Sequence, residues 1–440
     1  MLNNGEKKIA HSFDKSFYCQ IQYNKPSKYK EIEKFTSQAS NIITCGSNYS
    51  YSPIFLSKTS HVLDLRNFNR ILGFSKEKKE ITVESGLKIS ELLNFVLPHK
   101  LWIPQIPGYP FITVGGIVAS NAHGKSCGIH GTIRKSIKSI KIFHKTNGWL
   151  NLSENENKEI FDLTIGGLGL TGTIVSVTFT LEKFSGFFTT TKKLVKNLKE
   201  TITELESEKS EKYLYSWHKP SSTKNFGKGI IFINTLGNDE NVVLDNELNL
   251  NPKKTYSLRI WNRLTINLAN FLFYSINKRR LSENEVFQKV IFPFYGNEIY
   301  FGFFGNKGFI ETQLLIKKTN FDIFNEELYY LIKKSQPSIT LISLKKMSGE
   351  QKYLRFEADR ICLTLDLINS KLNRDFMEKL DKVCIKHNVI PSVIKDSRLD
   401  KKVVQNCYKD FESFKEKLLI FDKKRIYRSE VSDRLGIWVT

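Results

Sequence analysis

Short apolar runs with a period of two dominate the chain between Asn41 and about Lys183, and glycine or polar turns separate them. Such runs are typical of strands in small sheets. The predicted strands are NIITCG, HVLDL, KEITVESG, TVGGIVAS, IKSIKIF and TGTIVSVTFTLE, whereas ISELLNFVL has the spacing of a helix. This part of the chain is therefore predicted to be an α+β unit.

The pattern changes after Phe184, where glycine becomes rarer and charged helical stretches alternate with long strands. VKNLKETITELESEKSEK predicts a helix, and GFIETQLLIKK and RICLTLDLI predict strands. A chain of 440 residues is too long for one ordinary domain, and its 40% hydrophobic content can fill two cores. We therefore expect a second domain to begin at this point.

Three glycine-rich loops occur in the first unit, at residues 106–125, 128–131 and 165–172. Glycine lets backbone N–H groups approach a ligand closely and form concave anion-binding nests, which suit a pyrophosphate. The third loop has a literal G-x-G-x-x-G, but an alternating strand follows where the dinucleotide fingerprint requires a helix. The loops predict either a nucleotide-phosphate site outside the doubly wound fold or plain β-turns.

The charge balance is strongly basic, with 67 Lys and Arg against 45 Asp and Glu and a formal charge of +22. This excess favours anionic partners, although its scattered pairs also fit a solvated surface. A basic module that binds nucleic acid or a membrane, with loops that are merely turns, is the alternative of a different class. No nucleic-acid motif of recognisable spacing is present, so we expect no nucleic-acid partner.

Cysteine usage and the apolar stretches indicate the compartment. The six cysteines lie far apart without a C-x-x-C pair, so we expect neither a metal site nor disulfides and favour a reducing cytosol. The N-terminus lacks the apolar core of a signal peptide. The longest apolar stretch, 264–276, is shorter than the roughly 20 residues that span a bilayer. A cytoplasmic protein is predicted.

Read in order, the loops resemble a known flavin domain. VLDLRNFNRILGF, ITVESGLKISELLNFVLPHKLWIPQIPGYPFITVGGIVASNAHGK and IGGLGLTGTI are similar to the FAD-binding domain of the vanillyl-alcohol oxidase and p-cresol methylhydroxylase (PCMH-type) superfamily, from about Cys45 to Thr180. The likeness is greatest to its polyprenyl-phosphoryl ribose oxidases. It implies a two-part FAD-binding domain at 1–183, a substrate (cap) domain at 184–389 with an antiparallel sheet flanked by helices, and a segment at 390–440 that returns to the FAD domain and active site.

The resemblance also implies a set of cofactor contacts. By motif position they are Gly46, Tyr49, Pro107, Gly108, Thr113, Gly115, Gly116, Ser120, His123, Gly124, Gly131, Ile174 and Lys395. The first loop departs from the family pattern at Ser47, Asn48 and the pair Ser50-Tyr51. Some relatives attach FAD through a histidine in this loop; no histidine lies between Ser12 and Ser60, so non-covalent FAD is expected.

Substrate-side residues follow from the same resemblance. Lys395 falls at the position of an active-site lysine, and it can act as a base only if burial or a nearby cation lowers its pKa from about 10.4. Lys395, Cys362 and His123 are the expected catalytic set. The expected substrate contacts are Tyr49, Trp217, Gln313, Arg360, Cys362 and Lys395.

Two departures affect the substrate side. Ser392 replaces a family tyrosine and Arg360 a family asparagine. The arginine would suit a phosphate or carboxylate on the substrate, although a surface ion pair is an equal interpretation.

The function implied is oxidation of a secondary sugar hydroxyl by FAD, at C2 of a polyprenyl-phosphoryl pentose, giving a keto sugar. An NAD(P)H-dependent reductase partner would then complete an epimerisation. The alternative is an aldonolactone or other carbohydrate oxidase of the same superfamily, acting on a non-lipid substrate. The segment 256–280 mixes aromatic and basic residues, so we predict either peripheral contact with an anionic membrane or a core helix flanked by solvated charges.

Overall fold

The computed structural model describes residues 6–208, 212–220, 226–237, 248–249, 251–279 and 281–439. Helices and antiparallel sheets occur together, which confirms the predicted α+β class. The helices are α1 (Tyr29–Gln38), α2 (Ile89–Val96), α3 (Val114–Ala119), α4 (Lys158–Thr164), α5 (Leu198–Ser207), α6 (Arg263–Asn277), α7 (Phe287–Ile291), α8 (Ile299–Gly302), α9 (Phe321–Ser335), α10 (Lys371–Lys386), α11 (Lys401–Cys407), α12 (Phe411–Phe421) and α13 (Glu430–Arg434).

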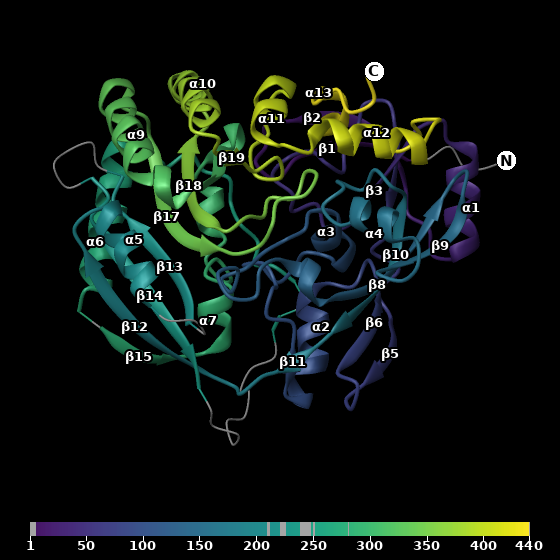
Figure 1. Cartoon of the computed structure of the whole chain (residues 1–440), viewed down its shortest axis with the longest axis horizontal. Helices are drawn as coiled ribbons and strands as arrows, with labels where there is room; N and C mark the ends of the chain where they lie inside the picture. Colours follow the sequence, from purple (N-terminus) through teal and green to yellow (C-terminus); the bar gives the residue numbers. More distant parts are fainter. Residues whose placement is uncertain are drawn as a thin grey trace.

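The strands form four sheets (Figure 1). Those of the first half are β1 (Glu6–His11), β2 (Tyr18–Asn24), β3 (Ile42–Cys45), β4 (His61–Asp64), β5 (Ile71–Ser75), β6 (Glu80–Glu84), β7 (Leu101–Trp102), β8 (Ile137–His144), β9 (Gly148–Ser153), β10 (Thr173–Thr180) and β11 (Glu182–Lys183). They pair as β1-β2-β4-β3, as β5-β6-β10-β8-β9 and as β11-β7. Five predicted strand runs are β3, β4, β6, β8 and β10, and the predicted helix is α2.

One predicted strand is a helix. The run TVGGIVAS is predicted as a strand because it is a short apolar run among glycine turns, but Val114–Ala119 form α3. Tertiary contacts override the local preference: the backbone N–H of Val114 donates to the Leu87 carbonyl at 2.9 Å, and that of Gly115 donates to the Ser85 carbonyl at 2.7 Å. Burial of Val114, Ile117 and Val118 then holds the short helix in the core.

The second half is built on one antiparallel sheet of eight strands. Its strands are β12 (Phe188–Val195), β13 (Lys212–His218), β14 (Gly229–Leu236), β15 (Ser282–Glu285), β16 (Phe309–Ile316), β17 (Ile339–Met347), β18 (Arg360–Ile368) and β19 (Ile390–Pro391). The apolar sides of α5, α9 and α10 pack on one face through a shared core that includes Leu198, Phe324, Leu314 and Leu363. The other face is turned to the first half of the molecule.

The end of the chain returns to the first sheet. A parallel bridge pairs Tyr427 with Ile42, and the Ser60 hydroxyl donates to the Arg428 carbonyl at 3.0 Å. In Figure 1, α11, α12 and α13 accordingly lie at the top of the view, beside β1 and β2. The boundaries at 183 and 389 stay a prediction.

Arg355 ties the loop before β18 to the third glycine loop. Its buried guanidinium donates to the carbonyls of Ile165 and Asp162 at 3.1 and 2.7 Å and to the Asp162 carboxylate at 3.0 Å. Removing a buried donor leaves the acceptors that it served unsatisfied.

We expect Arg355→Met to lower the free energy of unfolding by about 1–3 kcal/mol, because two buried carbonyls lose a donor, while the Asp162 carboxylate still has Lys352 at 2.7 Å. Urea denaturation followed by circular dichroism measures the change. The exposed Arg374, whose guanidinium donates to Asn369, provides the control Arg374→Met. Equal losses in the two variants would contradict the role of Arg355.

Candidate functional site

A large cavity lies between the loops of the first half and the inner face of the eight-stranded sheet, with an empty volume of about 2030 Å³ including the space open to solvent. Its walls come from residues 44–55, 107–125, 168–174 and 392–395 and from β16, β17 and β18. The expected cofactor contacts that line it are Gly46, Tyr49, Pro107, Gly108, Thr113, Gly115, Gly116, Ser120, His123, Gly124, Ile174 and Lys395. Gly131, on a left-handed turn near Lys135, is not among the lining residues.

The glycine loops stack closely at one end of the cavity. A Cβ on Gly46 would come within 2.0 Å of the Thr113 hydroxyl, and one on Gly124 within 2.0 Å of the Ile106 carbonyl oxygen. These contacts bring the first loop onto the start of α3. They also place the segment around His123 against the segment around Ile106. Only glycine permits this approach.

Three serine hydroxyls at this end have no hydrogen-bond partner among the described residues. Ser47, Ser50 and Ser85 line the cavity, and their buried oxygen atoms are unsatisfied. Buried polar groups are ordinarily hydrogen-bonded, so these hydroxyls fit a polar ligand. The pyrophosphate and ribityl groups of FAD supply such partners, and the glycine-lined walls leave room for them.

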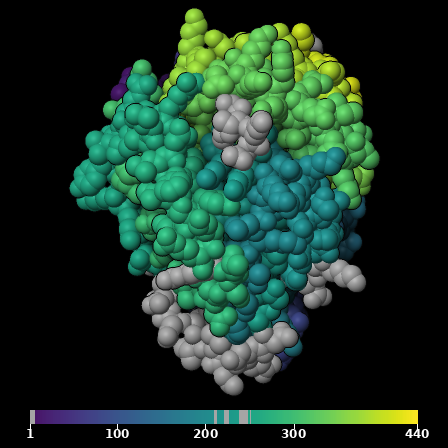
Figure 2. All heavy atoms as spheres, turned by 90° about the vertical axis from the view of Figure 1, so that its left-hand side faces the viewer, coloured from purple at the N-terminus to yellow at the C-terminus, as the bar shows by residue number. Residues whose placement is uncertain are grey.

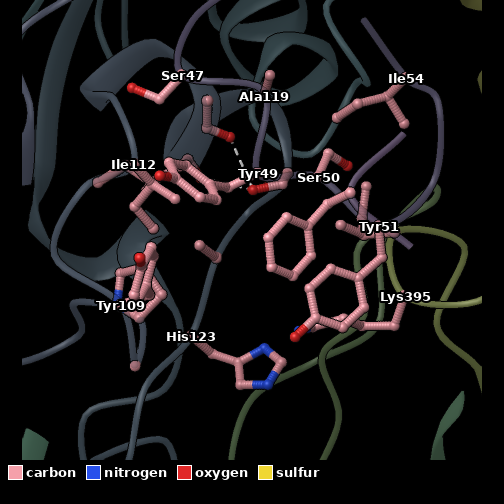
Figure 3. A pocket seen from close by; sticks show the side chains of 18 of the residues that line it. Ser47, Tyr49, Ser50, Tyr51, Ile54, Tyr109, Ile112, Ala119, His123 and Lys395 are labelled. Atoms are coloured by element: carbon pink, nitrogen blue, oxygen red, sulfur yellow. Dashed lines mark hydrogen bonds between the residues drawn. The ribbon is translucent and has the colours of Figure 1, made fainter. Parts of the chain in front are cut away.

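The opposite end of the cavity is a polar patch on the sheet. Alternate residues of three adjacent strands line it; they are Glu311 and Gln313 on β16, Ser343 and Lys345 on β17, and Thr364 and Asp366 on β18. Figure 3 shows Tyr51, His123 and Lys395 near one another, and Ser47 and Ala119 away from them. The cavity therefore has a loop-lined end and a charged end.

Lys395 is held between the sheet and the first loop. Its Nζ lies 3.1 Å from Glu311 Oε1 and 3.7 Å from the centre of the Tyr51 ring. The backbone N–H of Ser392 donates to the Gln313 carbonyl at 2.9 Å, and that of Ser52 donates to the Ile394 carbonyl at 3.0 Å. Both ends of this short segment are thus anchored, and the lysine is directed into the cavity.

Glu311 and Asp366 form a buried carboxyl pair. They lie directly opposite each other in the β16–β18 ladder. Burial, with the nearby Glu311 charge, raises the pKa of Asp366 well above its usual value, although the Tyr300 hydroxyl donates to it at 2.9 Å. Gln313 Nε2 donates to Glu311 at 3.0 Å. Burial and the neighbouring carboxylate thus favour the protonated form of Asp366, while Glu311 faces Lys395.

The cationic groups of the polar patch repel one another, which disfavours the charged forms of His123 and Lys125. Burial and the neighbouring Lys345 and Lys395 lower the pKa of His123 well below its usual value, so its imidazole is neutral. Burial and Lys345 lower the pKa of Lys125 to about 7. Lys125 Nζ lies 3.8 Å from the centre of the Tyr215 ring. An anion placed among these lysines would relieve their repulsion.

Three expected substrate residues lie outside the cavity lining. Trp217 packs on Phe273, with ring centres 4.7 Å apart. Arg360 donates to the carbonyls of Leu315 and Asn388, at 3.2 and 2.6 Å, so its position does not support binding of a substrate anion.

Cys362 is fully buried, and burial raises the pKa of its thiol to about 12, so the thiol is not reactive. It shares a strand face with Thr364 and Asp366, which do line the cavity. Cys362 itself does not line the cavity, and its expected contact with substrate stays a prediction.

Sequence reasoning missed Glu311, Asp366, Lys345 and Lys125. A usable signal existed, because charged residues at alternate positions of otherwise apolar strands indicate a polar patch on one sheet face. Their mutual approach depends on pairing between strands far apart in the chain.

Comparisons with known proteins agree with the geometry. Residues 25–153 match the FAD binding domain family. The chain is 22% identical to decaprenylphosphoryl-beta-D-ribose oxidase of Mycolicibacterium smegmatis over 90% of its length and 89% of the relative's. It is 26% identical to L-gulonolactone oxidase of Mus musculus over 46% of this chain and 47% of that protein. It is 27% identical to D-arabinono-1,4-lactone oxidase of Debaryomyces hansenii over 41% and 35%.

These findings confirm the resemblance to the PCMH-type superfamily and the nature of the cofactor. The chain is an FAD-dependent oxidoreductase whose N-terminal part carries the FAD-binding domain. The roles of individual site residues stay predictions.

We expect Gly124→Ala to weaken FAD binding about tenfold or more, because relieving the clash with the Ile106 carbonyl costs roughly 1–3 kcal/mol. The ratio of flavin to protein absorbance and FAD titration of the apoprotein measure it. A Cβ on Gly73 meets nothing within 4 Å, so Gly73→Ala is the control and should retain its flavin. Unchanged affinity in Gly124→Ala would exclude a close approach at this loop.

Asp366→Asn should change how stability depends on pH. A carboxyl whose folded pKa is raised contributes stability below its unfolded pKa of about 3.9 and loses it as the pH rises through the folded pKa. The amide imitates the neutral acid and avoids this loss. We therefore expect the difference in melting temperature, variant minus unchanged protein, to be larger at about pH 8 than at about pH 5.

Thermal unfolding at the two pH values measures this difference. The exposed Asp375, on the far side of α10, supplies the control Asp375→Asn, which should show a constant offset. If the unchanged protein and Asp366→Asn change their melting temperatures equally between the two pH values, the pKa of Asp366 is not raised.

Proposed function

We propose that this FAD-dependent oxidoreductase oxidises a secondary hydroxyl of a sugar, at C2 of a polyprenyl-phosphoryl pentose, to a ketone. The observation that carries the proposal is the continuity of the cavity: the glycine loops at one end and Lys395, Glu311 and the lysine group at the other line the same space. Similarity to the ribose oxidase along 90% of the chain supports the substrate class.

FAD, when bound, supplies the hydride acceptor. The chain must orient the carbinol and accept its hydroxyl proton. In this proposal Lys395 binds the hydroxyl oxygen, and the Glu311 carboxylate, 3.1 Å from its Nζ, takes the proton. Asp366 lies opposite Glu311 in the ladder, and burial beside that carboxylate favours its protonated form.

The other lysines support a phosphorylated substrate. Lys125 and Lys345 both line the cavity, and each lowers the pKa of His123 nearby. A neutral lactone gives these buried cations no counter-charge, whereas a phosphodiester does. Oxidation at C2 is the first half of an epimerisation, so an NAD(P)H-dependent keto-reductase is the proposed partner. A lipid-linked substrate places the protein at the inner membrane face.

The second candidate is an aldonolactone or other carbohydrate oxidase acting on a non-lipid substrate. Similarity to lactone oxidases over about half of the chain favours it. In that case the lysines bind a carboxylate or an acidic free sugar.

Anaerobic mixing with a panel of substrates tests the function. We expect flavin absorbance to bleach with a prenyl-phosphoryl pentose and not with free pentoses or L-gulono-1,4-lactone. Bleaching by the lactone or a free sugar alone would establish the second candidate.

Lys395→Met should keep its flavin and slow flavin reduction by about 100-fold or more, the range of positioned proton-transfer groups. The exposed Lys379 on α10 gives the control Lys379→Met, with an unchanged rate. Normal reduction by Lys395→Met would remove the lysine from the mechanism.

A further inference from the structure

Helix α6 presents its apolar side to solvent. Ile266, Asn270 and Tyr274, spaced by four residues, form its buried side. The outward side carries exposed apolar residues, which are Leu264 (81% exposed), Leu268 (58%), Phe271 (59%), Leu272 (49%), Phe273 (40%) and Ile276 (65%). A surface helix ordinarily has its apolar stripe toward the core, so this helix has the reverse arrangement.

The exposed apolar surface extends beyond the helix. Tyr256 and Leu258, in the segment that leads into α6, are 76% and 54% exposed. Single exposed apolar side chains are common, but a contiguous group of this size marks an interaction surface. We call residues 256–276 the α6 face.

The charge around the α6 face has one sign. Residues 251–281 contain seven Lys or Arg and no Asp or Glu. They are Lys253, Lys254, Arg259, Arg263, Lys278, Arg279 and Arg280, of which Arg280 lies outside the described residues. Among described residues, no ion pair neutralises the other six. Clustered cations beside apolar residues match an anionic partner with an apolar interior.

We propose that the α6 face docks on an anionic lipid bilayer. The leucines and phenylalanines would enter the boundary between headgroups and acyl chains, and the lysines and arginines would contact the anionic headgroups. No described helix is long and apolar enough to cross a membrane. The contact is therefore peripheral, with α6 lying in the plane of the surface.

The α6 face stands close to the cavity wall. Ile266, from the buried side of α6, packs in one cluster with Phe304 and Phe309, against which Phe301 and Tyr51 also pack. Phe301 and Tyr51 line the cavity. Figure 2, which looks onto the left-hand side of Figure 1, shows the green-teal segment that contains α6 as a ridge at the left edge. Docking would bring the cavity within one packed layer of the bilayer.

Sedimentation of the holoprotein with lipid vesicles tests the proposal without any turnover, so its result is independent of the proposed function. We expect binding to vesicles that contain phosphatidylglycerol and little binding to pure phosphatidylcholine. Leu268→Glu with Phe271→Glu should lower the bound fraction about tenfold or more, because two apolar anchors become anions. Flavin absorbance reports whether the variant is folded.

The matched control makes the same chemical change elsewhere. Ile420 on α12 and Val439 are 70% and 59% exposed, so Ile420→Glu with Val439→Glu also replaces two exposed apolar side chains and adds the same charge. We expect it to bind as the unchanged protein does. Equal binding by the two double variants, or equal binding to both kinds of vesicle, would overturn the proposal. A dimer in light scattering that the α6 variant converts to a monomer, without vesicle binding, would assign the face to a second copy and also overturn it.

Discussion

The alternation of apolar and charged side chains along three adjacent strands determines where the site lies. On β16, β17 and β18 one set of residues is apolar and packs under α5, α9 and α10, while the other set includes Glu311, Lys345 and Asp366. Charges on a buried face are costly unless they pair with one another. The sheet therefore needs Lys395 from the C-terminal segment and a cavity on its polar side. The position of the site follows from that requirement.

The sequence was sufficient for the class of fold, for most strands of the first half and for the loops that surround the cofactor. The sequence wrongly predicted a strand where α3 lies, because backbone hydrogen bonds to Ser85 and Leu87 decide the conformation of this run. It also failed for the carboxyl pair, because the approach of Glu311 to Asp366 depends on strand register. Motif position locates a residue along the backbone and not its side-chain direction, as Arg360 shows.

Positive charge occurs in two different settings in this basic protein, inside the cavity and beside the α6 face. Inside the cavity, burial and the charge of Lys345 lower the pKa of Lys125, and an anionic ligand would relieve this repulsion. At the α6 face, cations lie along the sequence beside apolar side chains that are largely exposed, such as Leu264, Leu268 and Phe271. The cluster around Phe304 connects the two regions. A net charge alone would not distinguish these arrangements.

The pairing of Ile42 with Tyr427 has a consequence for biosynthesis. The two residues are about 385 positions apart, and they share a small core with Ala39, Leu63 and Ile426. At a translation rate of about 5–20 residues per second, roughly 20–80 s pass between the synthesis of the two partners. During that interval the β3–β4 edge lacks its cover on the ribosome. The flavin half, although encoded first, is thus the last part of the protein to be completed.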